Sequence, residues 1–247
     1  MPAMLWLVRH GESAGNVARD LAEAAGHPVI DIPTRDMDVP LSALGERQSR
    51  ALGRWFAAMP EAEQPTILLT SPFARAVQTA ALIVEGMDPP PVHFLDERLR
   101  EKEFGALNKL TKAGIAARFP QEATLRDQVG KFYYRPPGGE SWCDVILRLR
   151  SVLDHIQLQY AGERVLLVAH QVVVMCFRYL LEHLTEQQIL AVDREKNLAN
   201  CSVTSYASSP CPDGRADVAL QLYNFVAPLE EAGTPVTTRP DAAGTSA

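Results

Sequence analysis

The stretch LVRHGES, from Leu7 to Ser13, ends an apolar run with an arginine, a histidine, a glycine and an acid in immediate succession. Apolar runs of this kind are typical of a strand that is buried on both faces of a parallel sheet. The change from Val8 to Arg9 and His10 places a cation and an imidazole where that strand ends. In open α/β sheets the ligand crevice lies beyond the carboxyl ends of the strands. The stretch therefore predicts a functional pocket at the end of the first strand.

Two later apolar runs, TILLT over 66–70 and RVLLVA over 164–169, repeat this pattern. The first is followed by Ser71, with Arg75 four residues on, and the second by His170. Segments with helical spacing separate the runs, which favours parallel strands joined by crossover helices. We therefore predict an α/β fold, a three-layer αβα sandwich with a mainly parallel central sheet. The strand ends of this sheet would bring the polar side chains together.

Apolar spacing predicts three helices, over residues 42–59, 71–87 and 139–160. Ser42 is the candidate N-cap of the first helix, and Ser71 followed by Pro72 has the same pattern at the second. Ser13 and Ser141 are further N-cap candidates, each with an acid nearby.

The chain is expected to form a single domain over residues 1–226, since 247 residues with 47% hydrophobic content can bury a large core. The irregular segment 102–139 is expected to form an insertion or lid over the sheet edge. Residues 201–208 and 216–226 alternate enough to be two more strands, paired through a turn. Residues 227–247 are rich in Pro, Gly, Thr and Ala without periodicity, which predicts a flexible tail.

Composition and charge narrow the functional class. The net charge of -6 disfavours a general nucleic-acid binder, although a local cluster of cations still permits a small anionic ligand. The chain has neither an apolar stretch of about 20 residues nor the features of a secretion signal, so we expect a soluble cytoplasmic protein without a membrane partner. The four cysteines show no metal-ligand spacing and are expected to be reduced, structural thiols. The oligomeric state stays open, with a homo-oligomer as one alternative.

Two histidines and two arginines at neighbouring strand ends indicate phosphoryl chemistry. Arg9, His10, Arg75 and His170 would concentrate positive charge around an anion. A neutral imidazole attacks phosphorus and forms a phosphohistidine, which divides one difficult displacement into two easier ones. The remaining cations would stabilise charge on the equatorial oxygens.

An acid is still needed to protonate the leaving oxygen. Glu101, in RLREKEFG, is the preferred candidate, and Glu103 is its local rival. The chain has no HExxH motif, no EF-hand and no clustered metal-ligand spacing, so neither a metal nor another cofactor is expected.

These motifs and their order resemble the histidine phosphatase superfamily, also called the phosphoglycerate mutase-like family. The resemblance extends over roughly residues 4–206. It is carried by LVRHGESAGN (7–16), DVPLSALG (38–45), TSPFARAVQTA (70–80), LREKEFG (99–105), PPGGES (136–141) and LLVAHQ (166–171).

The resemblance implies a role for each matching residue. His10 corresponds to the nucleophile and Glu101 to the proton donor. The phosphate pocket would be formed by Arg9, Arg75, His170 and Asn16.

The lid resembles the fructose-2,6-bisphosphatase domain of a bifunctional enzyme and related single-domain phosphatases. Segment 119–141 carries this similarity, and Arg126 and Lys131 match positions that hold a second phosphate there. Gln171 also matches the bisphosphatase branch. Met175 replaces an expected arginine, which leaves activity on a bisphosphate open.

A second branch, the cofactor-dependent phosphoglycerate mutases, is weakly similar over 107–119. Lys112 matches a substrate-binding lysine of that branch and replaces a tyrosine of the phosphatase branch. The long insertion between Asn16 and Asp38 fits the mutases poorly.

The sequence therefore predicts a metal-independent phosphomonoester hydrolase whose partner is a small phosphorylated substrate such as a sugar phosphate. A phosphoglycerate mutase and a non-catalytic phosphate-binding module are the alternatives.

Overall fold

A computed structural model of the chain describes residues 1–195, 197–210 and 216–238. These described residues form a six-stranded sheet with the strand order β3-β2-β4-β1-β5-β6. The strands are β1 (Met4–Arg9), β2 (Ile67–Thr70), β3 (Val92–Leu95), β4 (Arg164–Ala169), β5 (Val203–Pro210) and β6 (Ala216–Phe225). Strands β1 to β4 are mutually parallel, whereas β5 runs antiparallel to both of its neighbours. The prediction of a mainly parallel sheet is confirmed.

The three apolar runs of the sequence form β1, β2 and β4, at the centre of the sheet. Successive side chains of a strand point to opposite faces. In β1, Leu5 and Leu7 therefore enter the core on one side of the sheet, and Trp6 and Val8 enter the core on the other. Burial on both faces explains why the sequences of these strands are continuous apolar runs.

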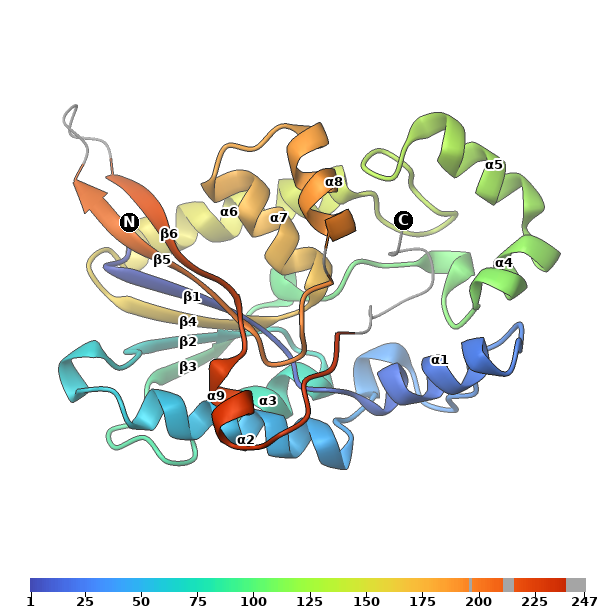
Figure 1. The fold of residues 1–247 in the computed structure, drawn as a ribbon. Coiled ribbons are helices and arrows are strands. Elements are labelled where there is room, and N and C mark those ends of the chain that lie inside the picture. Colours follow the sequence, from blue (N-terminus) through green and yellow to red (C-terminus); the bar gives the residue numbers. More distant parts are fainter. Residues whose placement is uncertain (196, 211–215, 239–247) are drawn as a thin grey trace.

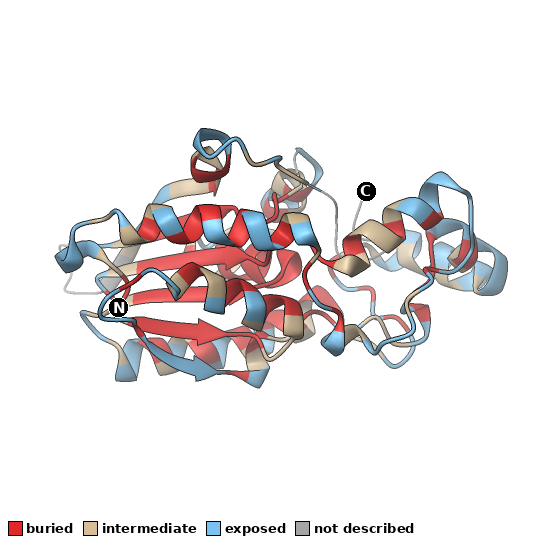
Figure 2. Cartoon of the chain, turned by 90° about the horizontal axis from the view of Figure 1, so that it is seen from below, coloured by how far each residue is buried: buried red, intermediate tan, exposed pale blue. Residues whose placement is uncertain are grey.

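Helices cover both faces of the sheet, which confirms the three-layer arrangement (Figure 1). One layer contains α6 (Trp142–Gln159), α7 (Gln171–Leu181) and α8 (Glu186–Glu195). The other contains α2 (Ala43–Ala57), α3 (Ala74–Val84) and α9 (Ala227–Glu231). Figure 2 shows the buried sheet between helices whose outer sides are exposed.

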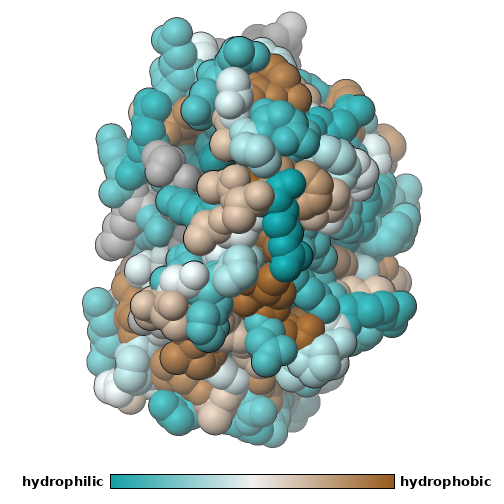
Figure 3. All heavy atoms as spheres, turned by 90° about the vertical axis from the view of Figure 1, so that its right-hand side faces the viewer, coloured by the Kyte–Doolittle hydropathy of each residue, from teal (hydrophilic) through white to brown (hydrophobic). Residues whose placement is uncertain are grey.

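Three helices lie beyond the carboxyl ends of the parallel strands (Figure 1): α1 (Ala14–Ala24), α4 (Lys112–Arg118) and α5 (Pro120–Val129). Four short 3-10 helices are also described: η1 (Asp36–Asp38), η2 (Glu61–Glu63), η3 (Glu97–Leu99) and η4 (Gly105–Leu107). The lid segment has a small core of its own, made by Leu107, Leu110 and Tyr134. Figure 3 looks onto this end of the molecule, where hydrophilic residues surround smaller hydrophobic areas.

The predicted N-caps are confirmed at Ser13, Ser42 and Ser141, each of which accepts a hydrogen bond from a backbone N–H in the first turn. The prediction for Ser71 is wrong. Helix α3 begins only after Phe73, which provides no side-chain cap. The hydroxyl of Ser71 instead lies beside a histidine at the end of β4.

The edge strand β3 is not predicted from the sequence. All four of its residues are exposed, with Val92 at 57% and Leu95 at 58%. A strand without a buried face shows no apolar alternation, so the pattern that reveals the central strands is missing here.

The C-terminal region corrects the prediction of a flexible tail over 227–247. Residues 227–231 form α9, and Leu229 is fully buried in the core between the sheet and α2. Burial of a leucine side chain stabilises such a short helix by about 2 kcal/mol. Residues 239–247 lie outside the described residues. The two predicted late strands are confirmed as β5 and β6.

Candidate active site

The end of β1 carries its polar residues into the interior. The backbone N–H of His10 donates to Ala169 O at 2.9 Å, which extends the pairing of β1 with β4 by one residue. Arg9 and His10 are both fully buried. The cation and the imidazole that follow the apolar run therefore lie at the carboxyl edge of the sheet, where the sequence predicts them.

The hydrogen bonds of His10 determine which ring nitrogen is reactive. His10 Nδ1 lies 2.7 Å from the carbonyl oxygen of Gly11. A carbonyl oxygen only accepts, so Nδ1 carries the hydrogen and Nε2 of the neutral ring keeps its lone pair. Arg75 Nε donates to that Nε2 at 3.3 Å. His10 thus has the tautomer that a nucleophile requires, and the lone pair of its Nε2 faces a guanidinium group.

Glycines allow the loop after His10 to pack tightly on the start of α2. A Cβ atom on Gly11 would lie 2.6 Å from Gly45 O, and a Cβ atom on Gly45 would overlap Glu12 O. Glu12 N donates to Gln48 Oε1 at 2.8 Å. The loop is therefore held against α2 by close backbone contact, which fixes the position of His10.

A segment far along the chain supports the same loop from the other side. Asn200 Nδ2 donates to His10 O at 3.0 Å, and Cys201 N donates to Arg9 O at 3.0 Å. Arg9 Nη1 donates to Leu198 O. The backbone carbonyls of both pocket residues are satisfied by this segment, and the guanidinium of Arg9 is anchored to it.

Arg75 comes from the first turn of α3 and is 3% exposed. Besides its contact with His10, it donates through Nη1 to Asp36 O at 2.7 Å and to Asp36 Oδ1 at 3.2 Å. Its guanidinium lies 4.9 Å from the ring centroid of Phe73. These contacts hold a cation beside the reactive nitrogen of His10.

His170 directly follows β4, the strand next to β1, and therefore lies beside His10. The ring centroids of the two histidines are 5.2 Å apart. His170 Nε2 lies 2.7 Å from Ser71 Oγ, and Nδ1 lies 3.8 Å from Glu101 Oε2. The aromatic ring of Phe73 packs against His170 at a centroid distance of 5.1 Å. The pocket therefore contains a histidine beside a carboxyl group.

The structure distinguishes the two candidate acids. Glu101 is 3% exposed, next to His170, and accepts a hydrogen bond from Lys102 N at 2.7 Å. Glu103 is exposed and accepts from Gly105 N at 3.1 Å. Only Glu101 is placed where it can reach the pocket.

Two helix starts also border the pocket. Asn16, in the first turn of α1, is 2% exposed, and its Oδ1 accepts from Ser13 N at 3.0 Å. Gln171 is the first residue of α7 and is 2% exposed. Helix N-termini direct backbone N–H groups and the positive end of the helix dipole towards an anion.

Two residues beside these groups have contacts that the sequence did not predict. Ser71 was predicted both as a polar group at a strand end and as a helix cap, and its hydrogen bond with His170 is the contact that only the structure shows. Lys102 is 8% exposed, and burial lowers its pKa to about 8 despite the opposing effect of Glu101 and Glu140. A lysine directly after the candidate acid in LREKEFG was the available signal for the second residue.

The family model described as "Histidine phosphatase superfamily (branch 1)" matches residues 5–211. The chain belongs to this superfamily. Within this histidine phosphatase, the model covers every strand end that contributes a side chain to the pocket.

Two curated relatives represent different activities. A 2,3-bisphosphoglycerate-dependent phosphoglycerate mutase from Gloeobacter violaceus is 35% identical over 196 residues, which are 78% of this histidine phosphatase and 82% of the relative. A 6-phosphofructo-2-kinase/fructose-2,6-bisphosphatase from Gallus gallus is 30% identical over 75% of the chain. The match spans only 34% of that longer protein.

Solved structures share the fold along nearly the whole chain. A mycobacterial glucosyl-3-phosphoglycerate phosphatase in complex with VO3 is 26% identical, with a TM-score of 0.69 over 90% of this chain and 99% of that one. The same mycobacterial phosphatase is known in complex with inorganic phosphate. This chain therefore shares its fold with a protein that is known in complex with VO3 and with inorganic phosphate.

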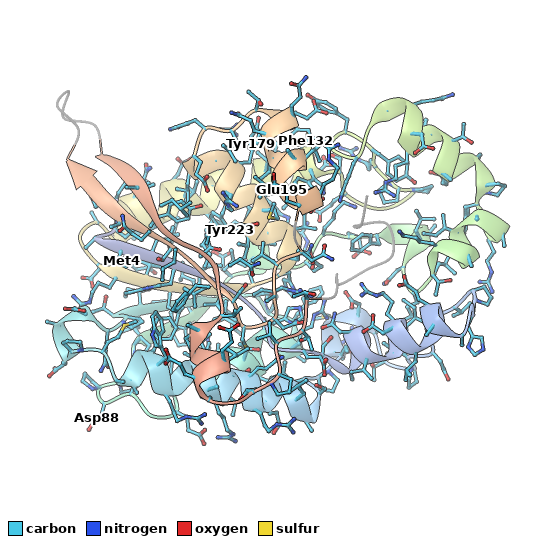
Figure 4. All side chains as sticks on the ribbon, viewed as in Figure 1. Met4, Asp88, Phe132, Tyr179, Glu195 and Tyr223 are labelled. Carbon is cyan, nitrogen blue, oxygen red and sulfur yellow. The ribbon has the colours of Figure 1, made fainter. Side chains whose placement is uncertain are left out.

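The predicted substrate residues of the lid fall into two groups. Arg126 and Lys131 line a cavity of about 340 Å³. Lys131 Nζ forms an ion pair with Asp193, and burial lowers the pKa of both cations. The lid returns to the main body beside this cavity, where the rings of Phe132 and Tyr179 are 5.4 Å apart (Figure 4). Lys112, in contrast, is exposed at the start of α4.

Three further features of the chain concern metal ligands, membrane-spanning helices and thiols. Among the described residues, no group of three or more His, Cys, Asp or Glu side chains could hold a metal ion. None of the described helices is long and apolar enough to cross a membrane. Cys143, Cys176 and Cys201 are free thiols, and burial raises the pKa of Cys201 to about 12.

Proposed function

We propose that this histidine phosphatase is a metal-independent phosphomonoester hydrolase that acts through a phosphohistidine on His10. The observation that carries the proposal is the hydrogen bond from His10 Nδ1 to Gly11 O, which keeps the lone pair on Nε2, the ring nitrogen beside Arg75. The similarity to solved phosphatases over about nine-tenths of the chain supports it.

In the first step His10 Nε2 attacks the phosphorus of the substrate. The new N–P bond forms as the P–O bond to the leaving group breaks. Glu101 gives its proton to the leaving oxygen, which departs as an alcohol. The carboxyl group has a suitable position for this transfer, since it is buried next to His170.

In the second step water attacks the phosphohistidine. Glu101, now a carboxylate, accepts a proton from that water as the O–P bond forms and the N–P bond breaks. Inorganic phosphate leaves, His10 regains its neutral ring and Glu101 regains its proton. Water access to the phosphohistidine separates this hydrolase from a mutase.

Fixed positive groups stabilise the transferring phosphoryl group. Arg9 and Arg75 would contact its equatorial oxygens, aided by His170, Asn16 and the backbone N–H of Gln171 at the start of α7. Arg75 shares its charge with an aspartate in η1, so an arriving phosphoryl group would replace that partner. Such preorganised charge needs little rearrangement during the reaction.

The substrate is a small phosphorylated metabolite of the sugar phosphate type. The lid cavity, lined by Arg126 and Lys131, offers further cationic groups for the remainder of the substrate. The names of the similar mycobacterial phosphatase and of the Gallus gallus protein both describe phosphorylated carbohydrates or their derivatives as substrates.

The test is phosphate release in excess chelator from 4-nitrophenyl phosphate, glucose 6-phosphate, fructose 2,6-bisphosphate and 3-phosphoglycerate. The wild type should release phosphate from some of these, and His10→Ala should lose activity by about 10³-fold or more. His27→Ala, at an exposed histidine, is the matched control and should keep full activity. A His10→Ala protein with near-normal turnover would overturn the proposal.

The leaving group tests the acid within the same experiment. The parameter to compare is kcat/KM, because it reports only the steps up to departure of the leaving group. For Glu101→Gln it should fall about 10²-fold or more on a sugar phosphate, whose alkoxide must be protonated. The loss should be far smaller on 4-nitrophenyl phosphate, because nitrophenolate leaves without a proton. Glu103→Gln, at the exposed rival, should behave as wild type. Equal losses of Glu101→Gln on both substrates would exclude Glu101 as the proton donor.

A phosphoglycerate mutase is the second candidate, favoured by the 35% identity to the Gloeobacter violaceus enzyme. The two functions differ in product. Phosphorus NMR of 3-phosphoglycerate with catalytic 2,3-bisphosphoglycerate should show growth of inorganic phosphate for the hydrolase. Growth of 2-phosphoglycerate without free phosphate would favour the mutase instead.

A further inference from the structure

Arg19 is a buried arginine that the proposed reaction does not use. It is 2% exposed and lies on α1, three residues after Asn16. Its Nη2 donates to Asp20 Oδ1 at 3.1 Å. In the part of the chain that the structure describes, Nε and Nη1 have no hydrogen-bond partner. A buried N–H group without an acceptor is costly, especially on a charged side chain, so this guanidinium is suited to receive one from a ligand.

The position of Arg19 places it near the phosphoryl pocket. Residues three apart on a helix share a face, and the buried residues of α1 are Asn16, Arg19 and Ala22. A helix rises about 1.5 Å per residue, so Arg19 lies about 4.5 Å farther along the axis than Asn16. That separation suits a second group two or three bonds away from a bound phosphoryl group.

The lid is joined to the far end of α1. Residue Val29 forms an isolated bridge with Leu110, and Thr111 Oγ1 donates to His27 O at 2.7 Å. Helix α1, with Asn16 and Arg19 on its buried face, therefore connects the loop after β1 to the lid. The residues that line the cavity beside Arg126 belong to the lid and to the α8 region, and Arg19 is not among them, so Arg19 is a separate cationic position.

We propose that Arg19 binds a second anionic group of the substrate, a carboxylate or a second phosphate. This inference rests on the proposed function. The planar guanidinium matches the oxygens of either group better than it matches a single hydroxyl. Asp20 holds Nη2 and orients the side chain, while Nε and Nη1 serve the ligand. The preferred substrates are thus phosphate esters that carry another negative charge close to the ester.

Two matched substrate pairs test the proposal. 3-Phosphoglycerate and glycerol 3-phosphate differ only by a carboxylate in place of a hydroxymethyl group, and ethylene glycol bisphosphate and ethylene glycol monophosphate differ by one phosphate that lies close to the ester. For each pair the ratio of kcat/KM values is measured for the wild type and for Arg19→Met. At least one ratio should fall about tenfold in the variant, and the pair affected identifies the anionic group.

Controls separate this role from a structural one. Arg19→Lys keeps the charge and should restore part of the affected ratio, whereas Arg118→Met, at an exposed lid arginine, should leave both ratios unchanged. Ratios that stay within twofold of wild type in a folded Arg19→Met protein would overturn the proposal. Equal losses on all four substrates would overturn it as well. If Arg19→Met does not fold, the same ratios measured in Arg19→Lys test the proposal, because loss of the planar guanidinium should still lower one of the ratios.

Failure of the proposed function is distinguishable. If the wild type releases no phosphate from any ester, calorimetric Kd values for the same four compounds replace kcat/KM. Arg19→Met should then weaken binding of the compound with the additional anion about tenfold more than binding of its partner. Unchanged Kd ratios would overturn the Arg19 site independently of catalysis.

Discussion

Lys102 is a buried cation next to the proposed acid. Its ammonium lies 4.4 Å from the ring centroid of Phe104, and burial lowers its pKa to about 8 from the ordinary 10.5. Glu101 and Glu140 favour the charged form but do not compensate for the loss of water. The folded protein therefore bears an electrostatic cost at neutral pH, which is typical of residues retained for function rather than for stability.

We expect Lys102→Met to increase the free energy of unfolding at pH 7 by about 2 kcal/mol, on the basis of 1.36 kcal/mol per pKa unit, reduced for partial solvation. Below pH 8 the lysine is protonated in both folded and unfolded states, and the cost of burial is fully present. Between about 8 and 10.5 the folded lysine is neutral while the unfolded one still binds a proton. Wild-type stability should therefore rise towards that of the variant over this range.

Urea unfolding of both proteins at pH 7 and pH 10 measures this difference, and the comparison cancels groups common to both. Lys112→Met, at an exposed lid lysine, is the control and should follow wild type at both pH values. A gap between wild type and Lys102→Met that stays constant or widens at pH 10 would contradict the lowered pKa.

At the scale of elements, the C-terminal segment after α9 is tied to the loop that bears His10. Thr237 Oγ1 donates to Asn200 Oδ1 at 2.9 Å, and Asn200 in turn donates to His10 O. Gln48 Nε2 donates to Pro235 O at 2.9 Å, while its Oε1 accepts from the backbone beyond His10. Residues more than 200 positions apart thus hold one loop in place.

We expect Thr237→Val to lower kcat roughly three- to tenfold with little change in KM. The variant loses the hydroxyl that orients Asn200, which holds the backbone of His10, and small displacements of a catalytic group reduce the rate. Steady-state kinetics on the best substrate provides the measurement. Thr238→Val, at the exposed neighbour, should be kinetically silent. If both variants match wild type, the segment does not position His10.

At the scale of the whole molecule, binding of a ligand should increase the free energy of unfolding. Inorganic phosphate at about 100 times its Kd should add about 2.7 kcal/mol to the free energy of unfolding. For a protein of this size that corresponds to a rise in Tm of roughly 5 to 10 °C. The pocket is built from β1, α3 and β4 together, so occupation at one point should stabilise the entire folded state.

Thermal unfolding with increasing phosphate, against sodium chloride of equal ionic strength, measures this effect. Arg75→Met should remove most of the increase, because it takes away a cation that faces the bound anion. Arg47→Met, at an exposed position of α2, should keep it. A Tm that responds equally to phosphate and chloride would argue against a specific anion pocket.

Local patterns determined the central architecture. Strands β1, β2 and β4 have continuous apolar sequences because both of their faces are buried. The residues directly after these strands lie at the strand ends, in the pocket. For this reason Arg9, His10 and His170 could be placed together without coordinates. The resemblance to the family added Asn16 and supported the preference for Glu101 that its place in the irregular segment had already favoured.

The tertiary structure decided what depends on distant contacts. The choice between Glu101 and Glu103 is a matter of burial beside His170, and no local pattern reports it. Strand β3 and helix α9 likewise lack a strong pattern, because one is exposed at an edge and the other is stabilised by a single buried leucine. The partners of Ser71 and Thr237 come from other parts of the chain. The sequence by itself determined which residues end the central strands, because burial on both faces produces a continuous apolar run in the local sequence. Only the folded chain determined which buried polar groups meet, because those contacts join residues that are far apart in the sequence.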